Sequence, residues 1–394
     1  MGTFSNIASI FSDIANSLRS KMGSQDTFTP SQMAGAVNNI PTGIQPFDNN
    51  YQYVAGVNNV TMEVEKYKSQ VTNASNMFKN NHSMIYDSYY FGNLVRTMSN
   101  CFNNCTEFNK PVVIKNGVTD MSRCFNNCKS FNRPVTIPNS VTDMSYCFYN
   151  CKSFNKPVTI PNSVTNMDSC FSKCTSFNQP VTIPNSVTGI DLLFSSCPNF
   201  NQSVTIPNSV TRLFGAFYEC TNFNQPVTIP NSATVISGLF HNCTKFNQPV
   251  TIPNSVTGSI SSIFENCISF NQPVTIPNSA NIRAMYRTFY NCKSFNQPIT
   301  IPRSVTSVEY LFNDCTNFGS DVFFENSENI TNAYSMFGGC NNKKIKNIYS
   351  NNAEPFTKSP SITAFTTTWN ALPDGNGYYN AEYNVYIYNN WTPS

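Results

Sequence analysis

The chain has 394 residues, a net charge of +3, and charged side chains at only 11% of its positions. It contains no basic run, which excludes the composition typical of nucleic-acid-binding proteins. No apolar stretch is long enough to span a membrane, and the N-terminus lacks the pattern of a secretory signal, because its apolar residues precede the first positive charge, Arg19. We therefore expect no membrane insertion and no export by the general secretory route.

Residues 1–40 are predicted to form a separate helical module. Five apolar residues fall on one stripe of a first helix, and Thr29-Pro30-Ser31 has the composition of a second helix start. The stripe consists of Ile7, Ile10, Phe11, Ile14 and Leu18. Residues 41–76 carry few signals and are expected to form a connector and an N-terminal cap for the part that follows.

The sequence of this module resembles a short N-terminal module of phage tail and baseplate-associated proteins from low-GC bacteria. That module is written I-A-x-A-I-R-x-K-x-G, followed by Tyr or Phe and T-P-x-x-M-A. The matching segments here are Ile14-Ala15-Asn16-Ser17-Leu18-Arg19-Ser20-Lys21-Met22-Gly23 and Phe28-Thr29-Pro30-Ser31-Gln32-Met33-Ala34. The resemblance implies that residues 1–40 attach the chain to a phage tail or baseplate protein.

A 23-residue repeat fills the centre of the chain, and a period of this length predicts stacked coils of one supersecondary unit each. Its lead residue is a phenylalanine whose spacing drifts by one or two residues after the seventh copy. The lead positions are Phe108, Phe131, Phe154, Phe177, Phe200, Phe223, Phe246, Phe270, Phe295 and Phe318. We predict about 11–12 coils over residues 77–340, stacked at the strand spacing of ~4.8 Å.

Each coil is predicted to contain one strand and one short helix. Val158-Thr159-Ile160 alternates as a strand with Val and Ile inward, and a proline on each side limits its pairing. Four residues of the preceding copy have the i, i+3, i+4, i+7 spacing of a helix face, with Thr142 as the expected N-cap. These four are Met144, Cys147, Phe148 and Cys151. The fold class is therefore an α/β repeat.

The fifteen cysteines follow the repeat and predict a column of buried free thiols. Four coils carry a C-x-x-x-C pair that could hold zinc or iron, but later coils replace its first cysteine by Leu, Ala or Met. A position that accepts such residues is a packing position, so we expect neither metal nor cofactor. The column is Cys105, Cys128, Cys151, Cys174, Cys197, Cys220, Cys243, Cys267, Cys292, Cys315 and Cys340.

The repeat resembles two related bacterial repeats. The segment Ile-Pro-Asn-Ser-Val-Thr, with the Phe-x-x-Cys that follows, resembles the BspA-type (Treponema-type) leucine-rich repeat. The Phe-Asn-Gln-Pro and Thr-Asp-Met-Ser parts resemble the Met- and Phe-rich surface-protein repeats of mycoplasmas and lactobacilli. Both resemblances imply a leucine-rich-repeat-like solenoid and, for these families, adhesion or protein binding rather than catalysis.

After Cys340 the repeat stops, and residues 341–394 are predicted to form a β-rich unit dense in tyrosine. Asp374-Gly375-Asn376-Gly377 is a strong turn signal, and Tyr383 to Tyr388 alternates as a strand. Its aromatic side chains could stack on sugar rings or could cap the last coil.

Candidate binding residues come from positions that vary among copies on the predicted helix side, and from the C-terminal unit. Tyrosines there could anchor a partner, although solvated positions under no constraint would vary in the same way. The candidates are Tyr146, Tyr149, Tyr218, His241, Tyr286, Tyr290, Tyr310, Trp369, Tyr379, Tyr386, Tyr388 and Trp391. With only His82 and His241 as histidines, and no phosphate-binding loop, we expect no enzyme.

One further trend lies just before the strand, where Lys110, Arg133 and Lys156 are replaced by glutamine in later coils. This gives the N-terminal coils a positive edge and suggests an acidic partner.

Together these patterns predict a non-catalytic phage tail-tip or receptor-binding protein in the virion, made in the host cytoplasm and recognising a host cell-surface glycan or protein. A homotrimer is one oligomeric state that this hypothesis allows. The alternatives are a bacterial surface adhesin, located at the cell surface, and a structural spacer or assembly protein of the tail.

Overall fold

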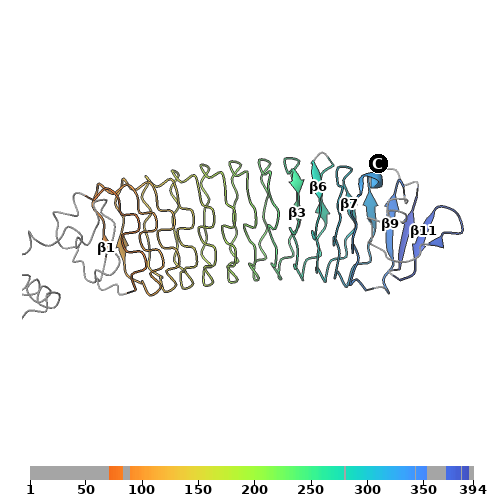
Figure 1. Ribbon diagram of the computed structural model, residues 1–394, viewed down its shortest axis with the longest axis horizontal. Helices are drawn as coiled ribbons and strands as arrows, with labels where there is room; N and C mark the ends of the chain where they lie inside the picture. Colours follow the sequence, from red (N-terminus) through yellow and green to blue (C-terminus); the bar gives the residue numbers. More distant parts are fainter. Residues whose placement is uncertain are drawn as a thin grey trace, which may run out of the picture. The chain divides into compact units, whose positions relative to one another are not determined.

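The computed structural model describes residues 71–82, 89–278, 281–341, 343–352, 370–382 and 384–389, all within the unit Thr61–Ser394. The expectations for the helical module of residues 1–40, for most of the connector, and for Trp369 and Trp391 lie outside the described residues. Within them, the repeats form coils that stack one upon the next (Figure 1). The predicted solenoid is therefore confirmed for the described part of the chain.

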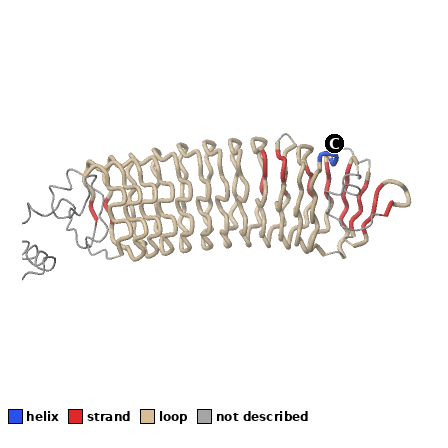
Figure 2. The backbone as a smooth tube through the Cα atoms, viewed as in Figure 1, coloured by secondary structure: helices blue, strands red, loops and turns tan. Residues whose placement is uncertain are grey.

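Regular secondary structure is sparse, and most of each coil consists of turns and extended chain (Figure 2). The described residues include no α-helix, only the 3₁₀ helix η2, Ser327–Asn329. The strands are β1 Tyr89–Tyr90, β2 Val112–Val113, β3 Val250–Thr251, β4 Gly258–Ser259, β5 Val274–Thr275, β6 Ile282–Ala284, β7 Ile299–Ile301, β8 Val322–Phe324, β9 Lys346–Ser350, β10 Asn370–Ala371, β11 Gly377–Asn380 and β12 Val385–Tyr388.

The short helix predicted in each coil is wrong, and two successive four-residue turns stand in its place. In one coil, the Cys147 N–H bonds the Met144 carbonyl at 3.1 Å, and the Cys151 N–H bonds the Phe148 carbonyl at 3.0 Å. The third residue of each turn, Tyr146 or Asn150, has positive φ, as type II turns require. The four buried residues of the coil were still predicted correctly. In the pattern Met-x-x-Cys-Phe-x-x-Cys, a helix and a pair of turns would both point Met, Cys, Phe and Cys into the core.

Bonding between coils explains why turns replace the helix. The N–H groups not used within the turns point to the next coil, where Tyr146 donates to the Asp168 carbonyl (2.9 Å) and Phe148 to the Cys170 carbonyl (2.9 Å). A helix would spend these donors internally and would leave adjacent coils without main-chain bonds. Stacking therefore favours the pair of successive turns, here called the turn run, which spans Met144–Cys151 in this coil. Twelve turn runs occur in the described residues.

The parallel contact that continues along the stack lies just before the turn run, at positions such as Thr142 and Asp143. Thr142, predicted as a helix N-cap, instead donates from its N–H (2.8 Å) and its Oγ1 (3.1 Å) to the Thr119 carbonyl of the preceding coil. The next residue pairs in parallel with its equivalents. This column runs Asn73, Thr97, Asp120, Asp143, Asn166, Gly189, Arg212 and Val235.

The Val-Thr-Ile triplets alternate as predicted, with Val158 and Ile160 buried and Thr159 exposed. Residues of the strand side pair as strands at the N-terminal end, where β1 pairs with β2, and toward the C-terminal coils, where β3 pairs with β5 and β7 with β8. No main-chain bond joins the triplets from Val135 to Ile229 to one another in the described chain. The flanking prolines lack N–H donors and limit the length of any pairing, but β3, β5 and β7 have the same prolines and still pair.

Two columns of phenylalanine fill the core. Phe148 stacks on Phe154 of its own coil at 4.5 Å between ring centroids and on Phe171 of the next coil at 5.6 Å. Every such ring from Phe102 to Phe318 is 1% exposed or less. The distance between equivalent rings of adjacent coils exceeds the ~4.8 Å expected between strands.

An asparagine ladder, which the sequence analysis did not anticipate, follows the lead phenylalanine. The Oδ1 of Asn155 accepts the N–H of Asn178 at 3.0 Å, and the same bond recurs between coils from Asn109 to Gly319. From the fourth copy onward, a glutamine side chain in most coils donates a second hydrogen bond to the ladder asparagine, as Gln179 Nε2 does to Asn155 Oδ1 (3.0 Å). The ladder satisfies backbone donors at a position where no sheet forms.

The predicted cysteine column is confirmed. All fifteen cysteines are free, and fourteen are buried. The column cysteine of each coil donates its thiol to a phenylalanine carbonyl of the preceding coil, as Cys220 Sγ does to the Phe194 carbonyl at 3.0 Å. Burial raises the pKa of these thiols, to about 12 for Cys105 and well above the usual value for Cys220.

We expect stability to fall steeply as the pH rises above about 9. The thiols keep their protons in the folded state to higher pH than in the unfolded state, so their contribution is complete below the unfolded pKa of 9.0 and is lost as the pH rises toward the folded pKa. Urea unfolding at pH 7 to 11 measures this. A midpoint that is unchanged up to pH 11 would contradict the raised pKa values.

The C-terminal segment continues the sheet of the last coils. The strand order is β10-β11-β12-β9-β8-β7. The pairs β10–β11 and β11–β12 are antiparallel, and the pairs from β12 to β7 are parallel. The predicted strand and turn are confirmed as β12 and the turn at Gly375. Lys346 of β9 is fully buried, and its Nζ donates to the carbonyls of Asn341 (3.1 Å) and Lys344 (2.9 Å).

Candidate recognition surface

The outward side chains of the turn runs form one surface, here called the turn face. In each run the second, third, sixth and seventh residues lie outside, as Ser145, Tyr146, Tyr149 and Asn150 do in one coil, and they are mostly half-buried. Because equivalent residues stack coil upon coil, the turn face is a grid of four columns. Its residues differ strongly between coils, whereas the strand side repeats the same Thr and Asn.

Backbone strain restricts two of these columns. The third and seventh positions both have positive φ, which glycine and asparagine adopt most easily. The seventh position is asparagine in most coils, but the third also holds Arg123, Tyr146, Leu192, Arg287 and Tyr310. Large side chains there cost free energy relative to glycine, and such outliers often mark functional positions.

The first group of candidates surrounds Tyr146 and Tyr149, whose ring centroids lie 5.6 Å apart. The guanidinium carbon of Arg123 lies 4.7 Å from the Tyr146 ring centroid, and Lys173 Nζ lies 5.1 Å from that of Tyr149. Two predicted residues are thus brought together with two cations from the adjacent coils.

Tyr218 and His241 form a second group, stacked at 4.3 Å with nearly parallel rings. His241 Nδ1 lies 3.6 Å from Glu265 Oε2, and the His241 side chain is only 13% exposed, so it is more covered than the sequence suggested. Burial lowers the pKa of His241, and the Glu265 carboxylate opposes that shift. The other Glu265 oxygen, Oε1, contacts Arg287 Nη1 at 3.4 Å and joins this group to the next.

Arg287 lies at the centre of the largest group, here called the Arg287 cluster. Its guanidinium carbon is 4.9–5.2 Å from the ring centroids of Tyr286, Tyr290 and Tyr310. Tyr334 extends the group, edge-on to Tyr310 at 5.2 Å, and is exposed. Burial, with help from Asp314, raises the pKa of Tyr290.

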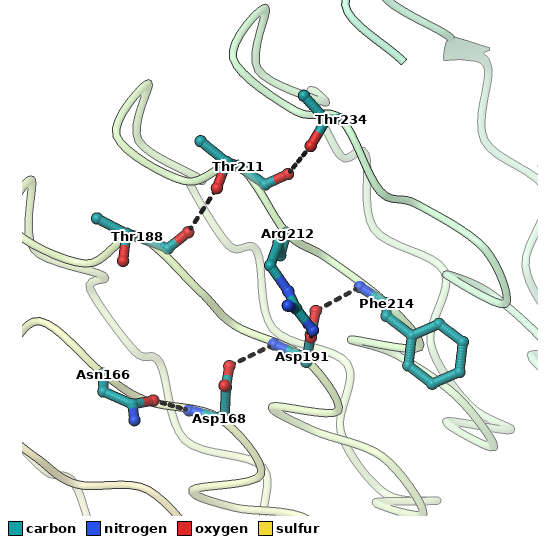
Figure 3. A network of polar contacts seen from close by, with 8 residues as sticks. All are labelled: Asn166, Asp168, Thr188, Asp191, Thr211, Arg212, Phe214 and Thr234. Carbon is teal, nitrogen blue, oxygen red and sulfur yellow. Dashed lines mark hydrogen bonds and ion pairs between the residues drawn. The ribbon is translucent and has the colours of Figure 1, made fainter. Parts of the chain in front are cut away.

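Between the first two groups the turn face carries an exposed phenylalanine on a polar network (Figure 3). In five coils the N–H at the second position of the turn run donates to an Asp or Asn side chain of its own coil, as the Asp168 N–H does to Asn166 Oδ1 at 3.0 Å. The two following coils have Gly189 and Arg212 at that acceptor position, which supply no acceptor oxygen. Figure 3 shows how the coils compensate.

Two aspartates accept from the next coil instead. Asp168 Oδ1 accepts the Asp191 N–H, and Asp191 Oδ1 accepts the Phe214 N–H, both at 2.9 Å. The second Asp191 oxygen pairs with Arg212, whose side chain is largely exposed. Phe214 ends this series, and its ring is 44% exposed. The substitutions at these positions therefore depend on one another.

Three predicted C-terminal candidates lie together on the outer face of the terminal sheet. Tyr379, Tyr386 and Tyr388 continue a row that begins at Phe323 and Tyr349, with ring centroids 4.5–6.2 Å apart and interplanar angles of 11–30°. Because these rings stack on one another, their faces are largely occupied. This row therefore offers ring edges and hydroxyls rather than open faces to a sugar.

Metal-ligating side chains and thiols are the reactive groups to consider in the described residues. They hold no group of three or more His, Cys, Asp or Glu side chains that could bind a metal ion. The buried thiols with raised pKa values are poor nucleophiles. No helix in the described part of the chain is long and apolar enough to cross a membrane.

The repeats match a known family. The profile of DUF285, described as a Mycoplasma protein of unknown function, matches residues 48–139, 119–228, 182–259 and 234–352. The chain belongs to the DUF285 family. This confirms the resemblance to mycoplasma repeats that Phe-Asn-Gln-Pro and Thr-Asp-Met-Ser suggested. The match begins at residue 48, so it does not bear on the phage-like wording of residues 1–40.

Several solved structures resemble this DUF285 chain. A leucine-rich-repeat protein of Bacteroides ovatus is 19% identical over 71% of this chain and 82% of its own, with a TM-score of 0.45. A leucine-rich cell surface protein of Faecalibacterium prausnitzii is 20% identical, with coverages of 75% and 87% and a TM-score of 0.46. For a leucine-rich-repeat protein of Eubacterium ventriosum the values are 22%, 56%, 80% and 0.32. Similarity at this level does not transfer a function. No curated protein matches the chain.

Several members of these groups were not among the predicted binding residues. Arg287 and Tyr334 belong with the predicted tyrosines, and Phe214 was not considered. The period of 23 to 25 residues identifies such neighbours, because residues one period apart in the same column lie in adjacent coils. Applying that spacing to Tyr310 would have found Arg287 and Tyr334.

Proposed function

We propose that this DUF285 protein is a non-catalytic recognition protein that acts at a bacterial cell surface and binds its partner, a surface protein or glycan, through the turn face. The solenoid supplies a long, ordered surface, and its coils bring Tyr and Arg side chains from distant parts of the sequence together. These residue types are enriched among the anchors of protein interfaces.

One observation carries the proposal. Arg287 and Tyr310 occupy positive-φ positions, where Gly215 and Gly238 stand in other coils, and they contact each other. Packing of the coils does not require these large side chains, because small residues serve in the same column elsewhere. A cost in backbone strain without a gain in core packing favours a role in recognition.

The virion hypothesis remains a more specific version of this proposal. The virion hypothesis depends on the resemblance of residues 1–40 to a phage module. The alternative, a bacterial surface adhesin, depends only on the repeats that the DUF285 profile matches. The adhesin is therefore the version we favour. Antibody labelling of intact cells that encode the chain separates the two, since an adhesin is labelled on the cell and a virion protein is labelled only on released particles.

Replacing Arg287 with alanine is expected to weaken binding to cells about tenfold, roughly 1.4 kcal/mol, because three tyrosines lose the cation that orders them. Labelled full-length protein is titrated on a panel of intact bacterial and mammalian cells, and the cell type that retains most wild-type protein is used. Arg283→Ala, which removes an exposed arginine outside the cluster, is the matched control and should bind as wild type.

A second variant, Arg287→Lys, keeps the charge next to Glu265 but loses the planar stacking group. It should also weaken binding, which separates recognition from a general loss of stability. Retention of the wild-type protein by none of the cells, or equal retention of Arg287→Ala and wild type, would overturn the proposal.

A further inference from the structure

A set of cations lies on a different surface, the flank that leads from the turn run to the strand. It is here called the basic flank and consists of Lys110, Lys129, Arg133, Lys152 and Lys156. Asn132 donates to Asn109 Oδ1 and Asn155 to Asn132 Oδ1, each at 3.0 Å, which places the residues that follow them one coil apart. Because these bonds recur from coil to coil, the cations form a short, regular array.

A second set of bonds fixes the other two lysines. Ser153 donates its N–H to the Lys129 carbonyl at 3.0 Å, and Ser176 donates to the Lys152 carbonyl at 3.1 Å. Lys129, Arg133 and Lys152 are exposed. Lys129 and Lys152 therefore occupy equivalent positions in consecutive coils, next in sequence to the segments that carry Arg133 and Lys156.

Carboxylates are scarce in the segments that carry the basic flank. Glu107 is the one carboxylate in its segments, residues 105–111, 128–134 and 151–157. Within the part of the chain that the structure describes, no ion pair joins Lys129, Arg133 or Lys152 to an acidic side chain. Such unpaired, aligned charges attract a polymer of the opposite sign.

Packing does not require a positive charge at these positions. Arg133 Nε donates to the Asn109 carbonyl at 3.1 Å, and the uncharged Gln248 makes the equivalent bond to the Asn224 carbonyl at 3.3 Å. In later coils the position of Arg133 and Lys156 holds glutamine, and Gln179 Nε2 bonds Asn155 Oδ1 at 3.0 Å. Lys156 makes no side-chain hydrogen bond to another described residue. This coil thus lacks a ladder bond that a glutamine would add, which indicates that a positive charge has a use there.

We propose that the basic flank binds a linear acidic polysaccharide. The array suits a polymer with regularly spaced carboxylates, and the exposed Pro134 and Pro157 add apolar surface for sugar C–H groups. Nucleic acid fits less well, because the flank has no exposed aromatic ring for base stacking and the chain carries a net charge of only +3. This site is separate from the turn face and does not depend on the function proposed for it.

The test uses the full-length protein and alginate, with uncharged dextran and double-stranded DNA as comparison polymers. The variant Arg133→Gln, Lys152→Thr, Lys156→Gln takes the residues that later coils have at the same positions. The matched control, Lys245→Ser, Lys293→Thr, Arg303→Asn, removes three exposed cations and likewise takes the residues of equivalent coils. Thermal unfolding verifies that both variants fold.

We expect wild type to bind alginate and to lose about tenfold in affinity when NaCl rises from about 50 to about 300 mM, because salt screens exposed charges. The flank variant should bind about tenfold more weakly than wild type, and the control should stay within about twofold. Equal loss in both variants, binding to dextran as strong as to alginate, or tighter binding to DNA than to alginate would each overturn the assignment.

Discussion

Replacing Phe194 with alanine is expected to lower the free energy of unfolding by about 3–5 kcal/mol. The ring is fully buried and stacks on Phe200 at 4.0 Å, on Phe171 at 5.9 Å and on Phe217 at 5.8 Å. The loss therefore opens a cavity in one coil and removes contacts to both neighbours. Urea unfolding followed by far-UV circular dichroism measures the change.

Thr205→Ala in the same repeat is the matched control, because this threonine is exposed on the strand side and should change stability by about 0.5 kcal/mol or less. A cost below about 1 kcal/mol at Phe194 would contradict the stacked core. Since each coil contacts only its neighbours, a weakened central coil also predicts separate unfolding of the two halves.

Replacing Gly377 with alanine is expected to break the pairing of β11 with β12. A Cβ at this glycine would meet main-chain atoms of Ile387, with the carbonyl oxygen only 1.9 Å away, and backbone cannot yield as a flexible side chain can. We expect a cost of roughly 3 kcal/mol or more, confined to the C-terminal strands. Hydrogen exchange of the amides in residues 377–388 measures it.

Gly375→Ala provides the comparison in the same hairpin. Gly375 has a φ of +71°, but a Cβ there meets no atom within 4 Å, so only the backbone preference is lost, about 1 kcal/mol. Equal protection of the strand amides in both variants would show that the close approach at Gly377 is not a constraint.

Much of the core was predictable because each coil repeats the same chemistry. The period located the coils, and the alternation of Val, Thr and Ile gave the buried face of the strand side. The turn run was misassigned because its spacing of apolar residues is also that of a helix. The distinguishing signal was the asparagine before six of the eleven column cysteines, as at Asn127 and Asn150, which favours the left-handed conformation of a turn.

Bonds between coils were harder to predict, since they depend on which side chain reaches the next coil. The asparagine ladder lies in the repeated Phe-Asn pair, but only the stack shows that its Oδ1 replaces a sheet bond. The same holds for Asp168 and Asp191, which accept from the next coil because Gly189 and Arg212 supply no acceptor oxygen.

The candidate site was predicted as residues but not as groups. Tyr286, Tyr290 and Tyr310 were correctly placed on one side of the solenoid, yet their shared contact with Arg287 depends on the registration of three coils. The C-terminal tyrosines lie together, but their rings cover one another. The turn face is therefore the stronger candidate for recognition.

The most direct test compares the turn face with the strand face on the same cells. The turn-face variant carries Tyr286→Ser, Tyr290→Asn, Tyr310→Ser and Tyr334→Ser, all residue types found in the same columns of other coils. The strand-face variant replaces the exposed threonines Thr182, Thr205, Thr228 and Thr251 with alanine. We predict that the turn-face variant loses about tenfold or more in affinity and that the strand-face variant binds as wild type. Loss in the strand-face variant alone would contradict the assignment of recognition to the turn face.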